Sequence, residues 1–255
     1  MQNIGNGAAA LVTGGARRIG RAISLGLAER GFKVVLHYKD SKAEAAALAD
    51  EIREKGGDAA TAEGNLASET AAASLMKEAL SAFGPISLLV NNASAFEDDA
   101  AQDFNTETWK LHFAVHALAP ALLAKDMAAN LPAGREGLIV NVIDQRVLKP
   151  TPKQFSYSLS KATLWAATKS MAQAYAPRIR VNAIGPGPTL KGARQEEADF
   201  RAQIDGLLLK RGADLSEFGQ AIGFLWQARS VTGQLIALDG GQHLAWETPD
   251  AIQPE

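Results

Sequence analysis

The sequence predicts an α/β protein in which helices cover both faces of one parallel sheet, a doubly wound arrangement. Short apolar runs alternate with longer helical patterns along all 255 residues. The apolar runs at residues 87–91 and 137–143 lack polar alternation, as strands buried on both faces require. Neither a linker nor a change of composition divides the sequence. We therefore expect residues 1–255 to form a single domain.

The first half of the chain supplies four of the expected strands and three of the expected helices. Apolar residues at helical spacing identify the first helix, which Gly31 ends. Ser68 is the expected N-cap of the third helix, and Gly84 stops that helix. The strands are expected at residues 8–13, 33–38, 59–63 and 87–91, and the helices at 19–30, 42–55 and 68–83.

The second half continues the alternation of strands and helices. Helices are expected at 107–130, 156–175 and 216–227, and strands at 137–143, 180–184 and 234–238. Residues 186–211 are rich in Gly and Pro at their start and charged later, so we expect a mobile segment over a site. The tail at 247–255 contains two prolines and is expected to be loosely ordered.

The composition excludes several functional classes. Hydrophobic residues make up 47% of the chain, and the net charge of -2 offers no attraction for nucleic acid or an anionic membrane. The absence of cysteine excludes disulfides, thiolate zinc sites and cysteine nucleophiles, and no metal site is predicted. No apolar run is long enough for a membrane helix, and residues 1–10 do not resemble a signal peptide. We expect a cytoplasmic protein.

The turn after the first strand, residues 13–20, reads TGGARRIG. Gly14 and Gly20 let the backbone approach a pyrophosphate, while the following helix presents free N–H groups and the positive end of its dipole. Arg17 and Arg18 add two cations beside the expected phosphates. A tight turn without a ligand is the alternative. The order of strand, turn and helix favours a dinucleotide site of the Rossmann type.

The end of the second strand bears on the choice of dinucleotide. An NAD-selective site usually has a carboxylate there, against the ribose 2′-hydroxyl, whereas this chain has Tyr38. NADP(H) is therefore favoured, while the nearby Asp40 would oppose a 2′-phosphate and keeps NADH open. The side chains expected to surround that phosphate are those of Arg18, His37, Lys39 and Ser41.

Tyr157 and Lys161 are four residues apart and share one face of a helix. A tyrosine titrates near pH 10, so we expect the ammonium of Lys161 and an oxidised nicotinamide ring to lower the pKa of Tyr157 toward neutrality. This pair is weak evidence by itself and strong evidence for a reductase after a dinucleotide turn. Asp144 ends the buried strand at 137–143, where ligands bind in open parallel sheets. It is expected to protonate a substrate heteroatom or to bond to it, and a simple turn residue is the alternative.

The chain resembles the short-chain dehydrogenase/reductases along nearly its whole length. The matching motifs are residues 13–20, 91–94, Tyr157-x-x-x-Lys161, 181–182 with 186–187, and 239–241. The resemblance implies a homotetramer built partly through the helices at 107–130 and 156–175. It also implies cofactor contacts from Gly14, Arg18, Ile19, Gly20, His37, Tyr38, Lys39, Ser41, Asn65, Leu66, Asn92, Ala93, Pro186 and Gly187.

The finer resemblance is to the pteridine reductases and dihydromonapterin reductases. Arg18 stands where most relatives have glycine, and Asp144 stands where most have a catalytic serine. In the segment NNASAF, the resemblance implies that Ser94 touches the ligand and that Phe96 stacks on the pterin. It implies hydride transfer from NADPH to a C=N bond of a dihydropterin or related pteridine, with Arg18 contacting substrate or phosphate. Tyr157 and Asp144 would deliver the proton, and Asp144 would donate best if burial kept it protonated.

Two other functions stay open. One is a general carbonyl reductase, for example one that acts on 3-oxoacyl thioesters, and Asp144 and Phe96 argue against it. The other is a non-catalytic, dinucleotide-binding regulator, which would have no chemical need for Tyr157 and Lys161. His116 takes the place of the family's helix asparagine, and its role is open. The natural pterin and its oxidation level are also open.

Overall fold

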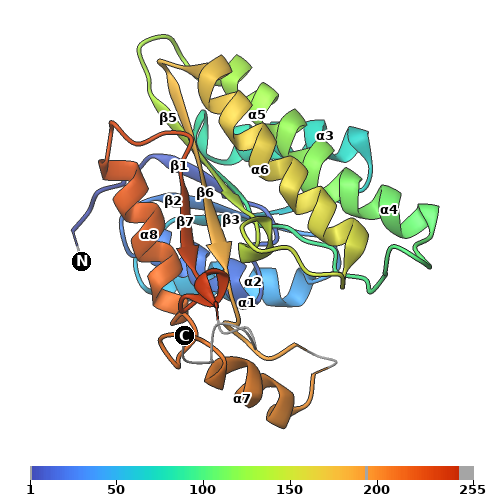
Figure 1. Cartoon of the computed structure of the whole chain (residues 1–255). Helices are drawn as coiled ribbons and strands as arrows, with labels where there is room; N and C mark the ends of the chain where they lie inside the picture. Colours follow the sequence, from blue (N-terminus) through green and yellow to red (C-terminus); the bar gives the residue numbers. More distant parts are fainter. Residues whose placement is uncertain (1, 193–194, 247–255) are drawn as a thin grey trace.

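The computed structural model describes residues 2–192 and 195–246 and contains a seven-stranded sheet (Figure 1). The strands are ordered β3-β2-β1-β4-β5-β6-β7, and each pairs with its neighbours in parallel. The strand order reverses between β1 and β4. In open sheets of this kind a crevice forms at such a point, beyond the carboxyl ends of the strands. The predicted doubly wound, Rossmann-type parallel sheet is confirmed.

The helices and strands follow the predicted alternation closely. The strands are β1 (Ala9–Val12), β2 (Lys33–Tyr38), β3 (Ala59–Glu63), β4 (Ile86–Asn91), β5 (Gly137–Val142), β6 (Ile179–Pro186) and β7 (Leu235–Leu238). The helices are α1 (Arg18–Ala28), α2 (Lys42–Glu54), α3 (Glu69–Phe83), α4 (Thr106–Phe113), α5 (Ala119–Asn130), α6 (Phe155–Tyr175), α7 (Glu197–Asp205) and α8 (Leu215–Gln227). Short turns of helix are η1 (Ala114–Leu118), η2 (Gln145–Val147) and η3 (Gln242–Leu244).

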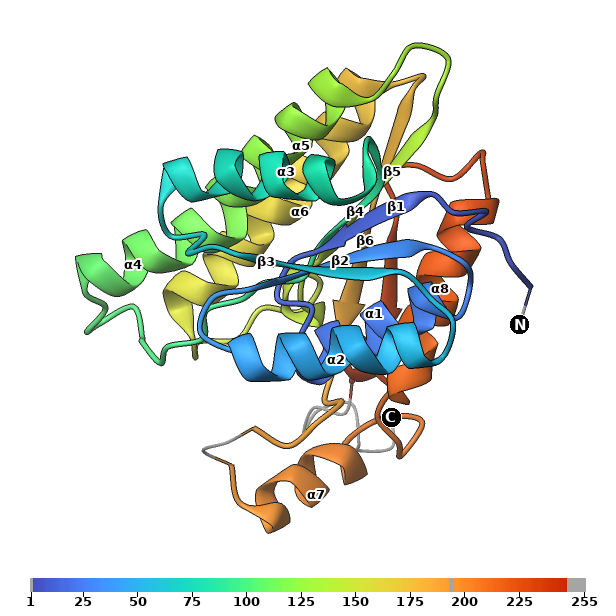
Figure 2. The ribbon, with the colours of Figure 1, turned by 180° about the vertical axis from the view of Figure 1, so that it is seen from behind.

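The two faces of the sheet bury separate apolar layers because alternate strand residues point to opposite sides. On β1, Leu11 packs with residues of α3, α5 and α6, whereas Val12 packs with residues of α1, α2 and α8. Figure 2 shows these two groups of helices on opposite sides of the sheet. Both layers leave the carboxyl ends of the strands uncovered for a site.

One helix was predicted over residues 107–130, and the structure interrupts it with the π-helical turn η1. The cause is Pro120, which has no N–H to donate to the carbonyl of His116 and whose ring would crowd that carbonyl. The N–H of Ala119 bonds instead to the carbonyl of Ala114, five residues back. The interruption falls beside the site, where π turns are frequently found.

Two further expectations concern particular segments. Residues 197–205 of the predicted mobile segment form the helix α7, which lies below the carboxyl ends of β6 and β7 in Figure 1, and the mobility of the segment stays a prediction. Ser68 does occupy the N-cap position of α3, but its hydroxyl is bonded to that of Thr70 and caps no backbone N–H. The expectation for the tail at 247–255 lies outside the described residues.

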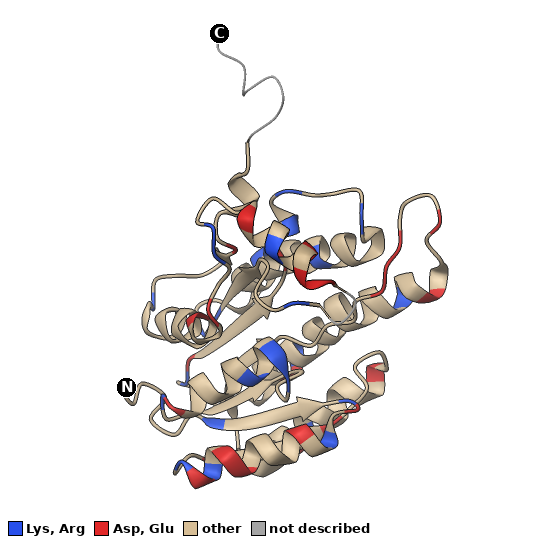
Figure 3. Ribbon diagram, turned by 90° about the horizontal axis from the view of Figure 1, so that it is seen from below, with Lys and Arg blue, Asp and Glu red and all other residues tan. Residues whose placement is uncertain are grey.

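The charge and mean hydropathy of the chain are those of an ordinary globular protein. Figure 3 shows the positions of acidic and basic residues interspersed along the ribbon. In the part of the chain that the structure describes, no helix is long and apolar enough to cross a membrane.

Candidate active site

A cavity of about 720 Å³ opens at the carboxyl ends of the strands, at the β1–β4 reversal. Every residue predicted to bind cofactor or substrate, or to act in catalysis, lines it. These are Gly14, Arg18, Ile19, Gly20, His37, Tyr38, Lys39, Ser41, Asn65, Leu66, Asn92, Ala93, Ser94, Phe96, Asp144, Tyr157, Lys161, Pro186 and Gly187. The fold thus gathers segments separated by more than 100 residues into one hollow.

The turn between β1 and α1 exposes its backbone to this cavity. Gly14 has φ +61°, and a Cβ added there would lie 3.1 Å from the Cα of Ala93. A Cβ added at Gly20 would lie 2.0 Å from the carbonyl oxygen of Gly14. A side chain at either position would collide with the turn itself or with Asn92 and Ala93, so both glycines allow close packing at the start of α1, where no acidic residue occupies the first turn. The turn suits the pyrophosphate of a dinucleotide.

His37 supports this turn through hydrogen bonds of its ring. Its Nδ1 accepts the N–H of Gly14 at 3.0 Å, so its Nε2 carries the hydrogen and donates to the carbonyl of Gly64 at 2.9 Å. Burial lowers the pKa of His37, which keeps the ring neutral. Both ring nitrogens of His37 already have partners within the protein, and its predicted place around a 2′-phosphate stays a prediction.

Arg18 adopts a left-handed conformation, with φ +52°. Glycine reaches this region without strain, which accounts physically for the glycine that the resemblance places there in most relatives. The Arg18 guanidinium donates to the carbonyls of Leu190 and Lys191, both at 3.1 Å. Arg18 therefore joins the phosphate turn to the segment that follows β6, across the mouth of the cavity.

The end of β2 presents the groups that would distinguish NADPH from NADH. Lys39 and Ser41 line the cavity beside Arg18. The carboxylate of Asp40 lies 3.4 Å from the ammonium of Lys39, and both side chains are exposed. Tyr38 is buried and donates to Glu63 at 3.2 Å. The cations outnumber the opposing carboxylate at this end of the cavity.

Thr13, just after β1, connects the two central strands and was not predicted as a site residue. Its hydroxyl accepts the backbone N–H groups of Asn92 and Ala93, both at 2.9 Å. The side-chain amide of Asn92 donates in return to the carbonyls of Thr13 at 2.9 Å and of Gly14 at 3.1 Å. The sequence feature that could have identified Thr13 is a polar residue at the end of an otherwise apolar strand.

Tyr157 lies at the inner wall, 6% exposed, and donates its hydroxyl to Oδ2 of Asp144 at 3.1 Å. Burial, and after it the charge of Asp144, raise the pKa of Tyr157 well above its ordinary value. The expected lowering of this pKa was for Lys161 acting together with an oxidised nicotinamide ring, and it stays a prediction for the cofactor-bound enzyme. The phenol is held in its protonated form.

Lys161 is buried one helical turn from Tyr157. Its ammonium donates to the carbonyl of Val142 at 2.9 Å and lies 5.8 Å from the centre of the Tyr157 ring. Burial lowers the pKa of Lys161 to about 8, while the charge of Asp144 partly opposes this change. Lys161 is therefore a cation at neutral pH that can lose its proton within the working range of an enzyme.

Asp144 receives three hydrogen-bond donors. Besides the Tyr157 hydroxyl, the backbone N–H of Arg146 meets Oδ1 at 2.8 Å, and the Arg146 guanidinium meets Oδ2 at 3.0 Å. In this arrangement Asp144 accepts hydrogen bonds from Tyr157 and Arg146, and its predicted role in delivering a proton to the substrate stays a prediction. Arg146, two residues further on, was missed by the sequence analysis.

Phe96 forms an aromatic wall of the cavity and is not a core residue. Its side chain is 46% exposed, and its ring centre lies 4.8 Å from that of Tyr157 at an interplanar angle of 75°. Ser94 lies 3.0 Å from Nε2 of His116. A flat ligand placed against Phe96 would also reach the hydroxyl of Tyr157. Across residues 2–192 and 195–246, no group of three or more acidic or histidine side chains could hold a metal ion.

The short chain dehydrogenase family model matches residues 8–202. The chain belongs to this family. It is an oxidoreductase of the short-chain type, as its sequence motifs predicted. Among curated relatives, the 3-oxoacyl-[acyl-carrier-protein] reductase FabG of Staphylococcus epidermidis is 30% identical over 240 residues, covering 92% of this chain and 98% of its own.

Solved structures give a finer comparison. FolM alternative dihydrofolate reductase 1 from Brucella canis, complexed with NADP, superimposes with a TM-score of 0.94 at 50% identity, covering 98% of this chain and 99% of its own. The corresponding Brucella suis enzyme, also with NADP, gives 0.93 at 52% identity, covering 95% and 98%. A blue fluorescent protein from a metagenomic library, in complex with NADPH, gives 0.87 at 28% identity, covering 94% and 99%. The resemblance to pteridine-reducing members of the family is therefore confirmed at the level of the fold and sequence.

Proposed function

We propose that this enzyme uses NADPH to reduce a C=N bond of a dihydropterin or a related reduced pteridine. One observation carries the proposal. The Tyr157 hydroxyl donates to the carboxylate of Asp144 at 3.1 Å, and the Tyr157 ring lies 4.8 Å, centre to centre, from the exposed ring of Phe96. A flat, nitrogen-rich ring that stacks on Phe96 would meet a proton donor and a carboxylate at one edge.

The cavity fits a nicotinamide dinucleotide phosphate. Gly14 and Gly20 allow the closely packed turn at the start of α1 that would hold the pyrophosphate, and Arg18, Lys39 and Ser41 line the end where a 2′-phosphate would lie. Both FolM enzymes were crystallised with NADP, which supports the same choice here. When bound, the cofactor supplies the hydride. Lys161 would bind the nicotinamide ribose, and Asn92 and Ala93 line the same cavity.

Tyr157 supplies the proton in this proposal. Because burial and Asp144 keep the phenol protonated, it can donate to a ring nitrogen that gains electrons from the hydride. Asp144 orients the hydroxyl, and Arg146 in turn orients Asp144. Lys161 stabilises the phenolate that remains after transfer. Phe96 and Ser94 hold the substrate in contact geometry, which is most of what such a site must contribute.

A 3-oxoacyl thioester reductase is the second candidate, favoured by the similarity to FabG. Against it stand Asp144, which has two donors from Arg146 and one from Tyr157, and the exposed Phe96 ring at the cavity wall. A non-catalytic regulator is disfavoured because Tyr157 and Lys161 lie together in the cavity.

Initial rates decide between these functions. NADPH and NADH are each tested against a dihydropterin, a quinonoid dihydropterin and an acetoacetyl thioester. We expect turnover of a pteridine with NADPH, and we expect Asp144→Ser to lose most of it. Turnover of the thioester alone would overturn the pteridine proposal. Turnover with NADH alone would overturn the 2′-phosphate argument. Full pteridine turnover by Asp144→Ser would remove Asp144 from proton delivery.

Two further expectations accompany this function. We propose a homotetramer, supported by the resemblance to the family and by the exposed apolar residues Leu118 and Leu159 at the helices expected to form contacts. Light scattering of the purified protein measures its mass. A cytoplasmic location stays a prediction, for which cell fractionation is the test.

A further inference from the structure

Two histidines lie stacked beneath the substrate side of the cavity. His112 on α4 and His116 on η1 are one helical turn apart and almost fully buried. Their ring centres are 5.6 Å apart, with planes 12° from parallel. Both rings meet the edge or face of Tyr157 nearly at right angles, at 5.9 Å and 5.3 Å. Their positions link the substrate loop, residues 94–97, to helix α6.

The contacts of His116 define its tautomer. Its Nε2 faces the backbone N–H of Ala95 at 3.1 Å and the hydroxyl of Ser94 at 3.0 Å. Its Nδ1 lies 2.8 Å from the hydroxyl of Ser160, whose own hydrogen is donated to the carbonyl of Tyr157 at 2.7 Å. Ser160 must therefore accept, so Nδ1 carries the hydrogen and Nε2 is the acceptor. His116 is neutral.

His112 repeats this pattern one turn earlier. Its Nε2 accepts the backbone N–H of Glu97 at 3.2 Å, and its Nδ1 lies 2.7 Å from the hydroxyl of Ser156. The hydroxyl of Ser156 donates to the carboxylate of Asp99, so Ser156 also accepts from the histidine. Each histidine therefore receives a backbone N–H from the substrate loop and donates to a serine of α6.

We propose that His112 and His116 are positioning residues, which as neutral Nε2 acceptors hold residues 94–97 at a set distance from α6. The inference deepens the proposed function, on which it rests, by explaining how Phe96 and Ser94 are placed against Tyr157. Because a misplacement of about 1 Å can cost about 100-fold in rate, two fixed hydrogen bonds in this loop have catalytic consequences.

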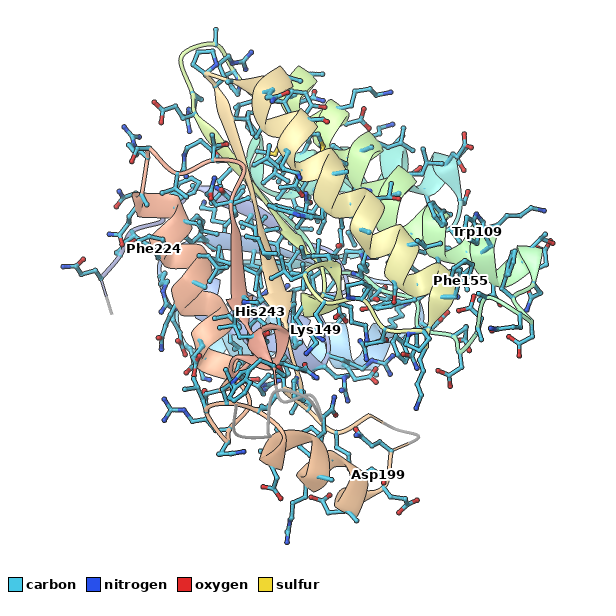
Figure 4. All side chains as sticks on the ribbon, in the orientation of Figure 1. Trp109, Lys149, Phe155, Asp199, Phe224 and His243 are labelled. Carbon is cyan, nitrogen blue, oxygen red and sulfur yellow. The ribbon has the colours of Figure 1, made fainter. Side chains whose placement is uncertain are left out.

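The electrostatic surroundings favour the acceptor state. Burial is the main cause that lowers the pKa of each histidine, and the charge of Lys161 adds to it. Asp99 and Glu97 act in the opposite direction on His112. Aromatic rings also pack together near the start of α4. Trp109 and Phe155 lie beside one another there, 6.0 Å between ring centres (Figure 4).

Two substitutions of His116 separate its contacts. In His116→Gln, the amide can reach the place of Nε2 and accept the N–H of Ala95, whereas in His116→Asn it reaches only the place of Nδ1 and can serve only Ser160. We expect His116→Gln to retain kcat/KM within about threefold and His116→Asn to lose at least about tenfold. The Kd for NADPH should stay within about twofold in both, because the cofactor turn is separate.

The matched controls are His243→Gln and His243→Asn. His243 is on η3 and bonds to Asp239 at 2.7 Å, so it offers a histidine with a donor contact outside the substrate loop. These two variants should not differ from each other in kcat/KM. If His116→Asn is as active as His116→Gln, or more active, the histidines only join the helices and the inference is overturned.

A second measurement does not depend on activity or on the folding of variants. The chain has 4 histidines, so nitrogen NMR of the wild type labelled in its imidazoles can resolve each ring. We expect His112 and His116 to be neutral with hydrogen on Nδ1, and His37 to carry it on Nε2. A charged ring or an Nε2–H tautomer at His116 would overturn the inference.

The same experiments distinguish this inference from the proposed function. If the wild type reduces only the thioester, the proposed function fails, and the order of His116→Gln and His116→Asn is then measured with the thioester. If the wild type reduces a pteridine but the order is reversed, the proposed function stands and the positioning role fails.

Discussion

At the scale of single residues, the site depends on three charged side chains near the Tyr157 phenol. They are those of Asp144, Arg146 and Lys161. Asp144 lies 3.1 Å from the Tyr157 hydroxyl and raises the pKa of both Tyr157 and Lys161. Arg146 and the phenol both donate to Oδ2 of the same carboxylate. A change at Asp144 therefore affects the whole proton-delivery side and not one bond.

Replacing Asp144 by Asn should move the alkaline limb of the kcat/KM profile to lower pH. The negative charge raises the pKa of Tyr157 and of Lys161, so its removal lets both groups lose their protons earlier as pH rises. The pH profile of initial rates measures this. Asp50→Asn, in an exposed ion pair on α2, is the control and should leave the limb unchanged. An alkaline limb at the same or a higher pH in Asp144→Asn would contradict the coupling of Asp144 to Tyr157 and Lys161.

Replacing Lys161 by Met should abolish turnover without reducing stability. Burial lowers the pKa of Lys161 from 10.5 to about 8, so the buried charge costs folding about 3 kcal/mol below pH 8. Losing the bond to Val142 costs only about 1 kcal/mol. Urea unfolding at pH 7 should give a free energy equal to or above that of the wild type.

The pH dependence of that stability gives a sharper test. Between pH 8 and 10.5 the unfolded chain binds more protons at Lys161 than the folded one, so wild-type stability should gain from this group as pH rises. Lys161→Met should lack this gain, whereas Lys169→Met, at an exposed position of α6, should keep it. Equal slopes for the wild type and Lys161→Met would contradict the buried charge.

At the scale of elements, the turn after β1 is stabilised by neighbours that lie far along the chain. Thr13 and Asn92 connect β1 to β4, and His37 on β2 accepts the N–H of Gly14. The π turn η1 plays a similar part for the substrate loop, because it follows His112 and contains His116. Both halves of the cavity are thus built on hydrogen bonds between elements.

Gly14→Ala should destabilise the protein more than Gly56→Ala. Both glycines have positive φ, so an alanine has a similar backbone strain of about 1–2 kcal/mol at each. At Gly14 the new Cβ also meets Ala93 at 3.1 Å and Asn92 at 3.3 Å, whereas at Gly56 nothing lies within 4 Å. Urea unfolding measures the difference, and titration with NADPH should show weaker binding only for Gly14→Ala. Equal losses of stability would mean that the close approach to Ala93 has no cost.

At the scale of the whole molecule, an early helix, α1, packs against a late one, α8. β1 pairs with β2 and β4, while α1 packs against α8, where a Cβ on Gly26 would lie 3.1 Å from the Cα of Gly219. α7 lies outside the two layers, below the ends of β6 and β7 (Figure 1). The site segments all meet at the carboxyl edge of the sheet.

We propose that residues 1–255 form one folding unit, and a single unfolding transition should follow. The chain has 4 tryptophans, so fluorescence and far-UV circular dichroism can both be followed in urea. The two curves should coincide at fixed protein concentration, because no set of strands can leave the sheet without exposing both apolar layers. Two separated transitions would show that the chain divides into independent units.

The sequence alone determined the alternation of strands and helices, the phosphate turn at 13–20 and the membership of Tyr157, Lys161 and Asp144 in one site. These features are local, because they depend on periodicity, on turn glycines and on spacing within one helix. The carboxyl edge of a parallel sheet then brings the ends of the strands together. This is why every predicted site residue lines the cavity.

The tertiary structure alone decided what several of these residues do. His37 is neutral because Gly14 and Gly64 occupy both of its nitrogens, and Asp144 is an acceptor because Arg146 and Tyr157 point donors at it. The raised pKa of Tyr157 likewise follows from burial. Protonation states and tautomers depend on partners from other segments and on the exclusion of water, and neither is encoded in the spacing of residues along the chain.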